Sequence, residues 1–257
     1  MSGSTRSYEM ARWFVERGHE VHMITSERTQ DVEQKEWKKT VESGINVHWY
    51  PVFYSNKMIF LKRIIAFLKF VIVSAKKAAS INGDIVFATS TPLTIALPAI
   101  YAKKRNRIPM VFEVRDLWPE VPVSLGEIEN KMLISLSRWL EKFAYKNSER
   151  IIALSEGMKE GIIKSGYKKN RVHVIPNSSD IAFFDVPKKR GGEFRNDRDW
   201  LKKRPLLVYT GTLGKVNGIS YLVRLAEETL KKDDEIRFLV VGSGREWEKP
   251  RNLIGKR

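Results

Sequence analysis

Short apolar runs alternate with helical segments along the first two thirds of this chain, and this alternation constrains the fold more than any other feature. The runs at residues 84–88 and 109–113 are almost entirely apolar, which is typical of parallel strands buried on both faces. A segment with helical character at residues 93–104 separates them. The pattern predicts an α/β fold with a doubly wound, parallel, Rossmann-like sheet.

The predicted elements follow one another in the order that such a sheet requires. We expect strands at residues 20–25, 46–50, 84–88, 109–113, 150–154 and 171–175. We expect helices from Ser4 or Thr5 to Glu16, at residues 58–79, 93–104 and 131–146, and one opened by Ser155 and Glu156. The polar stretch around residues 35–39 is interpreted as a connection.

The periodic pattern breaks once and then restarts, which predicts two domains. Residues 177–204 are rich in basic residues, contain Gly191 and Gly192, and have no sustained periodicity. We therefore expect a Rossmann-like domain at residues 1–176, a linker at 177–204, and the start of a second Rossmann-like domain at 205–257. Two strands, at residues 205–209 and 236–241, are fewer than a complete α/β domain usually has.

A group of charged residues follows directly after the buried run at residues 109–113. Arg115, Asp116 and Glu120 lie beside the rigid pair Trp118 and Pro119. In an open α/β sheet, ligands bind just past the carboxyl ends of the strands. We interpret these residues as a candidate site, and the alternative is an Arg–Asp ion pair that only closes a loop.

Small polar residues follow several other predicted strands. If the strands are placed correctly, these residues gather at one edge of the sheet: Thr25, Ser26, Thr89, Ser90, Thr91, Ser155 and Asn177. The alternative is that loops are polar in general and that Ser and Thr cap helices. The clustering is consistent with a site at this edge and equally with ordinary polar loops and helix caps.

The balance of charged residues favours an anionic partner. The chain has 46 Lys and Arg against 30 Asp and Glu, a formal charge of +16. Phosphate esters, nucleic acid and an anionic bilayer are all candidates. The absence of cysteine excludes disulfides and thiolate metal sites. His19 and His22 flank a strand entry where side chains alternate between faces, so we expect no metal site.

The predicted helix at residues 58–79 combines a wide apolar surface with basic residues. No Asp or Glu occurs from residue 43 to 83, whereas Lys62, Arg63 and Lys69 interrupt the apolar run. A membrane-spanning helix needs ~20 residues nearly free of charge. We expect this helix to lie on an anionic membrane surface; the alternative is burial against the sheet or another subunit.

A glycine-rich turn joins the two parts of the predicted second domain. Residues 209–218 connect a strand to a helix and include Gly211, Gly214 and Gly218, with Lys215 between them. Backbone N–H groups and a helix N-terminus could receive a phosphate there. The spacing matches neither the dinucleotide fingerprint nor the Walker P-loop, and a tight turn is the alternative.

Several motifs occur together in an order that resembles a known family. They are residues 4–6 before a helix ending in residues 16–21, the block Glu-Val-Arg-Asp-Leu-Trp-Pro-Glu at 113–120, residues 152–157, Val-Ile-Pro-Asn at 174–177, residues 211–218, and Val-Val-Gly-Ser-Gly at 240–244. The chain resembles the family-4 glycosyltransferases of the two-Rossmann-domain (GT-B) type. Within that family it resembles the bacterial and archaeal enzymes that build surface polysaccharides on a lipid carrier.

This resemblance implies metal-independent transfer of a hexosyl or N-acetylhexosaminyl group with retention, without a cofactor. The donor would be a nucleotide-sugar, with UDP expected, and the acceptor a lipid-linked or polysaccharide precursor at the inner face of the cell membrane. It implies that Asp116 contacts the donor sugar or acceptor, with Arg115 and Glu120 beside it. The expected donor-binding residues are Gly3, Ser4, Thr5 and Arg6 near the reacting phosphate, and Gly211, Thr212, Gly214, Lys215, Asn217 and Gly218. Nucleic acid is not an expected partner.

The sequence also departs from the family pattern. Members usually have a strand and glycine-rich turn before the position of Ser4, an Arg at the position of Thr212 and a Lys at that of Asn217. We therefore expect a fragment that lacks the first strand and most of the donor domain, with impaired transferase activity. The alternative function is a non-catalytic module that docks on a membrane or partner through a basic amphipathic face.

Overall fold

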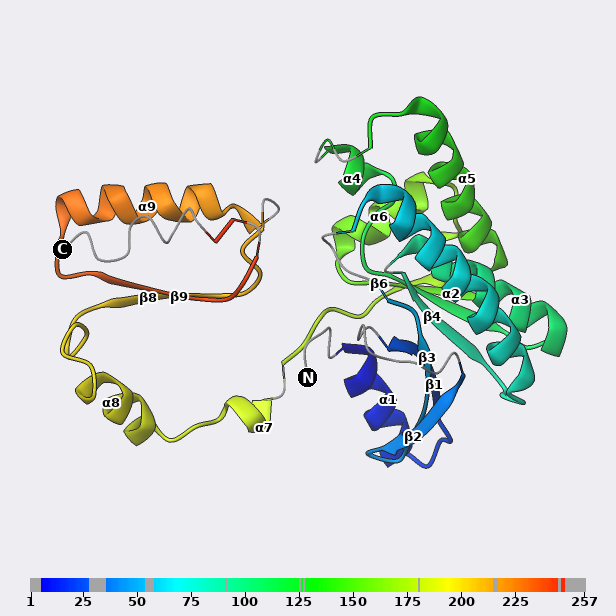
Figure 1. Cartoon of the computed structure of the whole chain (residues 1–257), viewed down its shortest axis with the longest axis horizontal. Helices are drawn as coiled ribbons and strands as arrows, with labels where there is room; N and C mark the ends of the chain where they lie inside the picture. Colours follow the sequence, from blue (N-terminus) through cyan, green and yellow to red (C-terminus); the bar gives the residue numbers. More distant parts are fainter. Residues whose placement is uncertain are drawn as a thin grey trace. The chain divides into compact units, whose positions relative to one another are not determined.

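The computed structural model describes residues 6–27, 36–53, 58–90, 92–124, 126, 128–179, 181–214, 217–244 and 246–247. The chain divides into two compact units, Met1–Ser178 and Ser179–Arg257. Figure 1 labels the elements of both units, which are treated separately below. The expected domain limits, including the linker, stay predictions.

The main sheet of the first unit is fully parallel, as the apolar runs predicted. Its strands lie in the order β4 (Val86–Ser90), β5 (Met110–Val114), β6 (Arg150–Ala153) and β7 (Val172–Val174). Ala88 pairs with Phe112 and Phe112 with Ile151. Met110, Phe112 and Ile151 are fully buried, so the core of the unit lies on this sheet. The α/β fold class with a parallel sheet is confirmed.

A second sheet of the first unit includes a strand that the sequence did not predict. β1 (His22–Glu27) pairs in parallel with β3 (Ile45–Pro51), and β2 (Lys38–Glu42) pairs antiparallel with β3. Ser43 and Gly44, both at positive φ, form the turn between β2 and β3. Two such residues in succession are typical of a type I′ hairpin turn. β2 exposes Lys38, Lys39 and Val41, so it lacks the buried alternation by which strands are recognised.

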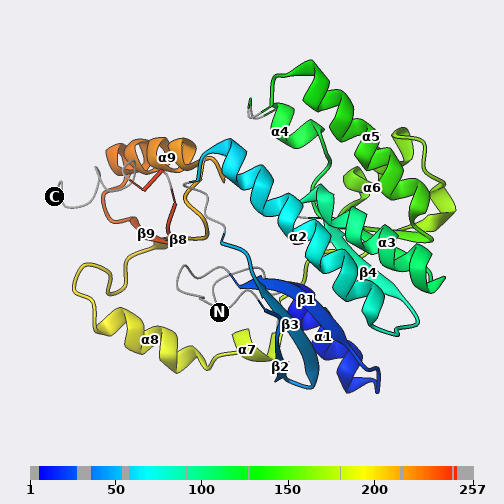
Figure 2. The same cartoon turned by 45° about the vertical axis from the view of Figure 1, so that its right-hand side comes forward.

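The described strands thus pair as two sheets, whereas the sequence predicted one. β1 is an edge of the three-stranded sheet and β4 is an edge of the four-stranded sheet. Helix α2 (Phe60–Ser80) connects them and packs against both β1 and helix α3 (Ala96–Asn106). Figures 1 and 2 show α2 alongside α3 in both views. The two sheets are therefore joined by helix packing as well as by the chain.

The helices of the first unit begin and end close to where local sequence signals predicted. Asn130 caps α5 (Lys131–Asn147) by accepting from the amides of Met132 and Leu133, and Ser155 caps α6 (Glu156–Lys164) by accepting from that of Met158. Gly18, at a φ of 85°, follows α1 (Arg6–Glu16) as the expected stop. The remaining short elements are η1 (Leu93–Ile95), α4 (Glu120–Ser124) and η2 (Lys169–Arg171).

The second unit contains a two-stranded parallel sheet and helices. β8 (Leu206–Thr210) pairs with β9 (Arg237–Val241), and α9 (Ile219–Lys232) connects them. Two helices, α7 (Ile181–Phe184) and α8 (Lys188–Asn196), occur within the range that the sequence predicted as an aperiodic linker. Gly191 and Gly192 inside α8 lower its helix propensity, which explains why the sequence did not indicate it.

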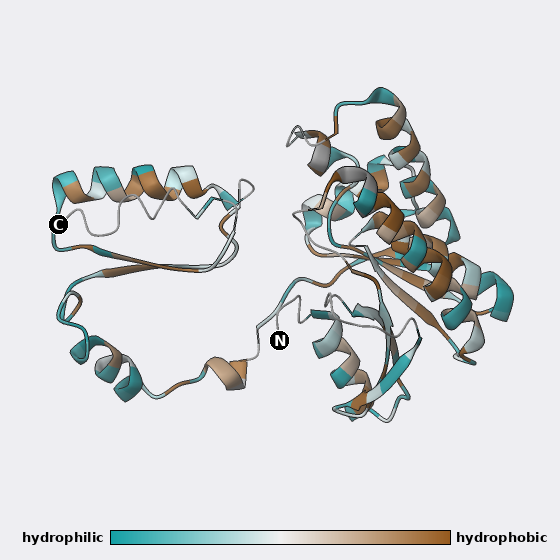
Figure 3. Ribbon diagram, viewed as in Figure 1, coloured by the Kyte–Doolittle hydropathy of each residue, from teal (hydrophilic) through white to brown (hydrophobic). Residues whose placement is uncertain are grey.

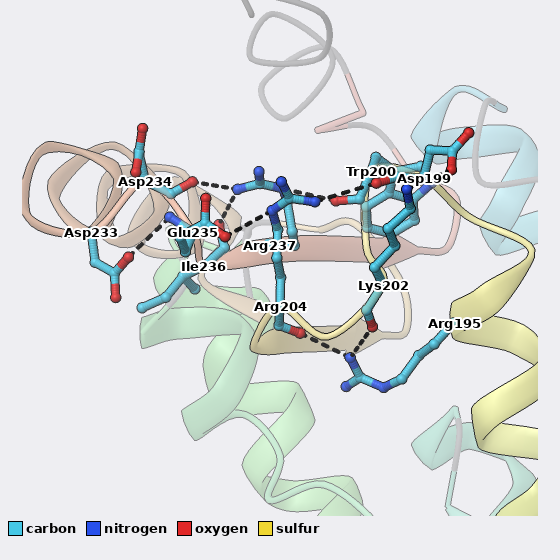
Figure 4. Close-up of polar contacts among 10 residues, drawn as sticks. All are labelled: Arg195, Asp199, Trp200, Lys202, Arg204, Asp233, Asp234, Glu235, Ile236 and Arg237. Atoms are coloured by element: carbon cyan, nitrogen blue, oxygen red, sulfur yellow. Dashed lines mark hydrogen bonds and ion pairs between the residues drawn. The ribbon is translucent and has the colours of Figure 1, made fainter.

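Guanidinium groups attach the segment after α8 to the two-stranded sheet. Figure 4 shows Arg195 donating to the carbonyl oxygens of Lys202 and Arg204, at 3.2 and 2.8 Å, and Arg237 donating to that of Trp200 at 2.9 Å. Arg204 also pairs with Glu235 at 2.9 Å. Leu201 is fully buried in the same segment. These bonds connect residues 195–204 with one another and with the end of the chain that forms β9.

A buried carboxyl group lies inside the first unit, on the inner side of α5. Tyr145 donates its hydroxyl hydrogen to Glu141 at 2.9 Å, and both residues are buried. Burial raises the pKa of Glu141 to about 7, and the charge of Glu120 raises it further while the Tyr145 bond opposes the shift. Burial likewise raises the pKa of Tyr145. Because the folded state holds this proton more tightly than the unfolded chain, Glu141 weakens the fold as pH rises from about 4.5 to about 7.

We expect Glu141→Gln to raise the melting temperature near pH 8 by roughly 2–6 °C and to change it little near pH 4.5, where Glu141 is already neutral. Thermal unfolding followed by circular dichroism at both pH values measures this. Glu160→Gln, at an exposed position of α6, is the matched control and should change neither value. A stabilisation by Glu141→Gln that is equal at both pH values would contradict the assignment.

Candidate functional site

A fully buried glutamate lies at the carboxyl end of β5. Glu113 Oε1 accepts from Arg6 Nε and Glu113 Oε2 accepts from Thr89 Oγ1, both at 2.8 Å. Thr89 is directly opposite Glu113 on the neighbouring strand β4. A buried charge is costly unless it is paired and hydrogen-bonded, and here both carboxylate oxygens have a partner. Glu113 was not among the predicted site residues, although it stands as a charged residue inside an apolar run.

Arg6 joins three parts of the first unit through its guanidinium group. It is the first residue of α1, and besides Glu113 it donates to the carbonyl oxygens of Ile175 and Pro176, each at 2.9 Å. These bonds use three of the five N–H groups of the guanidinium. The start of α1, the end of β5 and the segment after β7 therefore meet at one place. The start of α1 thus lies beside Glu113, which precedes Asp116 by three residues in the sequence.

The predicted role of this helix start in phosphate binding stays a prediction. Gly3, Ser4 and Thr5, which were expected to approach the phosphate with Arg6, lie outside the described residues. The structure gives Arg6 a firm structural role in holding Glu113. Its two further N–H groups leave room for the expected contact with an anion.

The turn after β5 has a buried apolar side and an accessible polar side. Leu117 and Trp118 pack against the core and Pro119 is buried, with a cis peptide bond between Trp118 and Pro119. The Arg115 amide donates to Ser90 Oγ at 3.0 Å, whereas Asp116 is exposed. Within the described part of the chain, no ion pair joins Arg115 to Asp116. The loop-closing pair that was the alternative for these residues is thus not formed there.

Glu120 begins the short helix α4 and is exposed. Its charge raises the pKa of Glu141 and of Tyr145 on α5, so the structure brings it close to that buried pair. The catalytic roles expected for Arg115, Asp116 and Glu120 remain predictions. What the fold establishes is that all three follow the carboxyl end of β5, where Arg6 and Glu113 meet.

The glycine-rich turn of the second unit uses much of its own hydrogen-bonding capacity. The amides of Gly211 and Leu213 donate to the carbonyl oxygens of Val241 and Ser243, at 3.0 and 2.8 Å. The amide of Gly214 donates to Thr212 O, and Asn217 Nδ2 donates to the same oxygen at 2.6 Å. Lys215 lies outside the described residues. The amides of Gly211, Leu213 and Gly214 are therefore already hydrogen-bonded within the protein.

Helix α9 begins directly after this loop. Gly218, at a φ of 66°, is its N-terminal cap residue and provides no side chain to cap the first amides. The positive end of a helix dipole favours an anion. Of the expected donor-binding positions, Gly211, Thr212, Gly214, Asn217 and Gly218 all lie in this loop, and their binding role stays a prediction.

Two glycines after β9 allow the chain to lie directly on this loop. A Cβ atom on Gly242 would be 1.8 Å from Gly211 O, and one on Gly244 would be 2.1 Å from Leu213 O. Because both neighbours are backbone atoms, they cannot move aside without moving the loop. The motif at residues 240–244 thus has a packing role that its sequence alone did not predict.

Comparison with protein families identifies the chain. The model of Glycosyltransferase Family 4 matches residues 3–183. The chain belongs to glycosyltransferase family 4. The match covers residues 3–178 of the first unit, including Arg6, Glu113, the Asp116 turn and the segment after β7.

Related family-4 and GT-B proteins are distant in sequence and longer than this chain. WcaI of Escherichia coli K12, named as a colanic acid biosynthesis glycosyl transferase, is 22% identical over 249 residues, which are 92% of this chain and 61% of WcaI. The solved structure of Anabaena HepE with UDP-glucose is similar with a TM-score of 0.56 at 13% identity, covering 90% of this chain and 64% of HepE. A second solved structure, described as trehalose-6-phosphate from E. coli bound with UDP-2-fluoro glucose, is similar with a TM-score of 0.66 at 12% identity. The similarity covers 98% of this chain and 66% of that one. These likenesses show the GT-B fold.

Two further findings concern the described residues of this family-4 chain. Among the described residues, no group of three or more His, Cys, Asp or Glu side chains is suited to hold a metal ion. His22 and His48 stack and bond at 3.0 Å, and His22 also bonds Glu20 at 2.9 Å. In the same part of the chain, no helix has the length and apolar character needed to cross a bilayer.

We expect Arg6→Met to destabilise the first unit by about 3–5 kcal/mol, because it leaves the Glu113 carboxylate buried without its cation. Urea unfolding followed by circular dichroism measures this. Arg150→Met, which removes an exposed pair with Glu149 at 3.0 Å, is the control and should cost less than ~1 kcal/mol. The double variant Arg6→Met with Glu113→Gln should recover part of the loss; a double variant as unstable as the two losses summed would contradict the ion-pair explanation.

We expect Gly242→Ala to separate the glycine-rich loop from the end of β9 and to destabilise the second unit by about 1–3 kcal/mol or more. Hydrogen exchange should show loss of protection at the amides of Gly211 and Leu213. Gly192→Ala in α8 meets no atom within 4 Å, and alanine favours a helix, so it should be neutral or slightly stabilising. Unchanged protection at Gly211 in Gly242→Ala would refute the packing role.

Proposed function

We propose that this family-4 chain takes part in transferring a hexosyl or N-acetylhexosaminyl group from a UDP-sugar to a lipid-linked or polysaccharide-precursor acceptor. On this proposal the transfer retains the anomeric configuration, needs no bound metal and takes place at the inner, cytoplasmic face of the cell membrane. Family membership supports sugar transfer. The name of WcaI supports a polysaccharide product, and the HepE structure supports UDP as the nucleotide.

The observation that carries the proposal for the first unit is the Arg6–Glu113 contact. It holds the start of α1 and the segment after β7 at the carboxyl end of β5, where Asp116 follows as an exposed carboxylate. Ligands of parallel α/β sheets bind at this edge. We assign Asp116 to the reacting sugar or the acceptor hydroxyl, Arg115 to its orientation, and Glu120 to the same edge. The acceptor would bind to this unit.

The second unit would bind the donor nucleotide. The leaving diphosphate gains most from positive charge and amide donors as the glycosidic bond breaks. The start of α9, which follows Thr212, Gly214 and Gly218, places the positive end of a helix dipole at this position. Lys215 would add charge to the same position.

A second candidate function is a non-catalytic module that docks on a membrane or a partner. Helix α2 favours it, because Ile65, Leu68 and Ile72 are exposed beside Lys62 and Lys69. The chain also spans 61% of WcaI, so the activity of the longer relatives is not carried over as a whole. In either function α2 would meet an anionic membrane surface.

We expect Asp116→Asn to lower sugar transfer by at least about 100-fold without changing the melting temperature, if Asp116 acts on a reacting group. Transfer of labelled sugar from UDP-glucose or UDP-N-acetylglucosamine into lipid extracts measures this, in the chain and in WcaI with its aligned residue changed. Asp84→Asn, an exposed aspartate before β4, is the control. Full transfer by Asp116→Asn would remove Asp116 from the site, and transfer by neither wild-type protein would favour the docking module.

A further inference from the structure

Three helices of the first unit share an outward surface that is apolar and basic. α3 packs against α2 on one side and against α5 on the other, and the three lie side by side in Figures 1 and 2. Large apolar side chains on this surface are between 51% and 79% exposed. They are Ile65, Leu68 and Ile72 of α2, and Met132, Leu136 and Trp139 of α5. We call the outward surface of α2, α3 and α5 the helical face.

The apolar residues of the helical face follow helical spacing. Steps of three and four residues separate Ile65, Leu68 and Ile72, and steps of four and three separate Met132, Leu136 and Trp139. Each set therefore forms one stripe on its helix. The opposite sides are the buried ones, at Ala66 and Ser74 of α2 and at Ala144 and Tyr145 of α5. Figure 3 shows α2 as largely hydrophobic, with hydrophobic and hydrophilic residues alternating along α5.

The charge of these helices has one sign. α2, α3 and α5 contain twelve Lys and Arg residues and one acidic residue, Glu141, which is buried and faces inward. The exposed basic side chains include Lys62, Lys69, Lys76, Lys104, Arg138 and Lys142. A contact between Lys104 and the Phe143 ring at 5.9 Å, and stacking of Phe143 on Trp139, join the α3 and α5 parts of this surface.

We infer that the helical face as a whole, rather than α2 alone, docks on an anionic lipid bilayer. Basic groups beside exposed aliphatic side chains and a tryptophan suit the head-group region, where each Lys or Arg near the surface contributes about 1 kcal/mol. Nucleic acid would leave the aliphatic stripes without a partner. A second copy docked through the same face would bring two strongly basic surfaces together, which opposes a symmetric dimer.

The helical face also has a direction. Helix α5 begins at the carboxyl edge of the four-stranded sheet, because it lies in the connection between the parallel strands β5 and β6. Helix α2 follows the carboxyl end of β3 along the chain. The exposed apolar residues of α5 lie in its first half, and those of α2 end at Ile72. The membrane would thus lie nearest the edge that carries Asp116. Resting on the proposed function, this places a bilayer-embedded acceptor, and not a soluble one, within reach of that edge.

Vesicle flotation of the full chain tests the docking. We expect binding to phosphatidylcholine vesicles that contain phosphatidylglycerol and much weaker binding to phosphatidylcholine alone. Lys62→Gln, Lys69→Gln and Lys142→Gln together should weaken binding on the order of 100-fold. Lys188→Gln, Lys189→Gln and Arg190→Gln on α8, with the same charge change at exposed positions, should weaken it far less. Equal loss in both triple variants would overturn the assignment to the helical face.

Tryptophan quenching tests the part that extends beyond α2. Lipids brominated in the acyl chains should quench the protein, and Trp139→Phe should remove a larger share of that quenching than Trp13→Phe, whose residue is equally exposed on α1. Equal effects of the two variants would overturn the role of α5. A dimer that Leu136→Ser abolishes in sedimentation experiments would also overturn the bilayer assignment. Binding without sugar transfer would refute the proposed function alone.

Discussion

The buried ion pair between Glu113 and Arg6 is the constraint on which the carboxyl edge of the first unit depends. Glu113 is fully buried, so its charge requires both the Arg6 guanidinium and the Thr89 hydroxyl. The guanidinium in turn needs further acceptors, which the carbonyl oxygens of Ile175 and Pro176 provide. The buried charge of Glu113 therefore helps to position the start of α1, which carries Arg6, and the segment after β7, which carries Ile175 and Pro176.

This polar contact matters more because the apolar core is divided. One cluster, around Phe112 and Ile151, covers the four-stranded sheet, and another, around Ala11 and Ile45, lies between α1 and the three-stranded sheet. In the described part of the chain the two sheets have no strand pairing with each other. Arg6 belongs to the helix of the second cluster and binds the strand of the first, so it supplements α2 in joining the two.

Local signals predicted most of the elements, whereas contacts distant in sequence were not predictable. Strand β5 lies within one residue of its predicted range because its residues are buried on both faces, and Ser155 caps α6 as expected. β2 was missed because it is an exposed edge strand whose position depends on the turn at Ser43. The sequence placed Arg115 and Asp116 after a strand, but it could not show that Glu113 would bind a residue 107 positions away.

The glycine-rich loop of the second unit is held by side-chain as well as backbone hydrogen bonds. Asn217 Nδ2 donates to Thr212 O, which also accepts from the Tyr209 hydroxyl. A side-chain amide has two N–H donors, so one remains after this bond. Asn217 therefore mainly holds the loop in shape. If this loop binds a diphosphate, as proposed, the positive end of the α9 dipole is placed to attract it more directly than position 217 is.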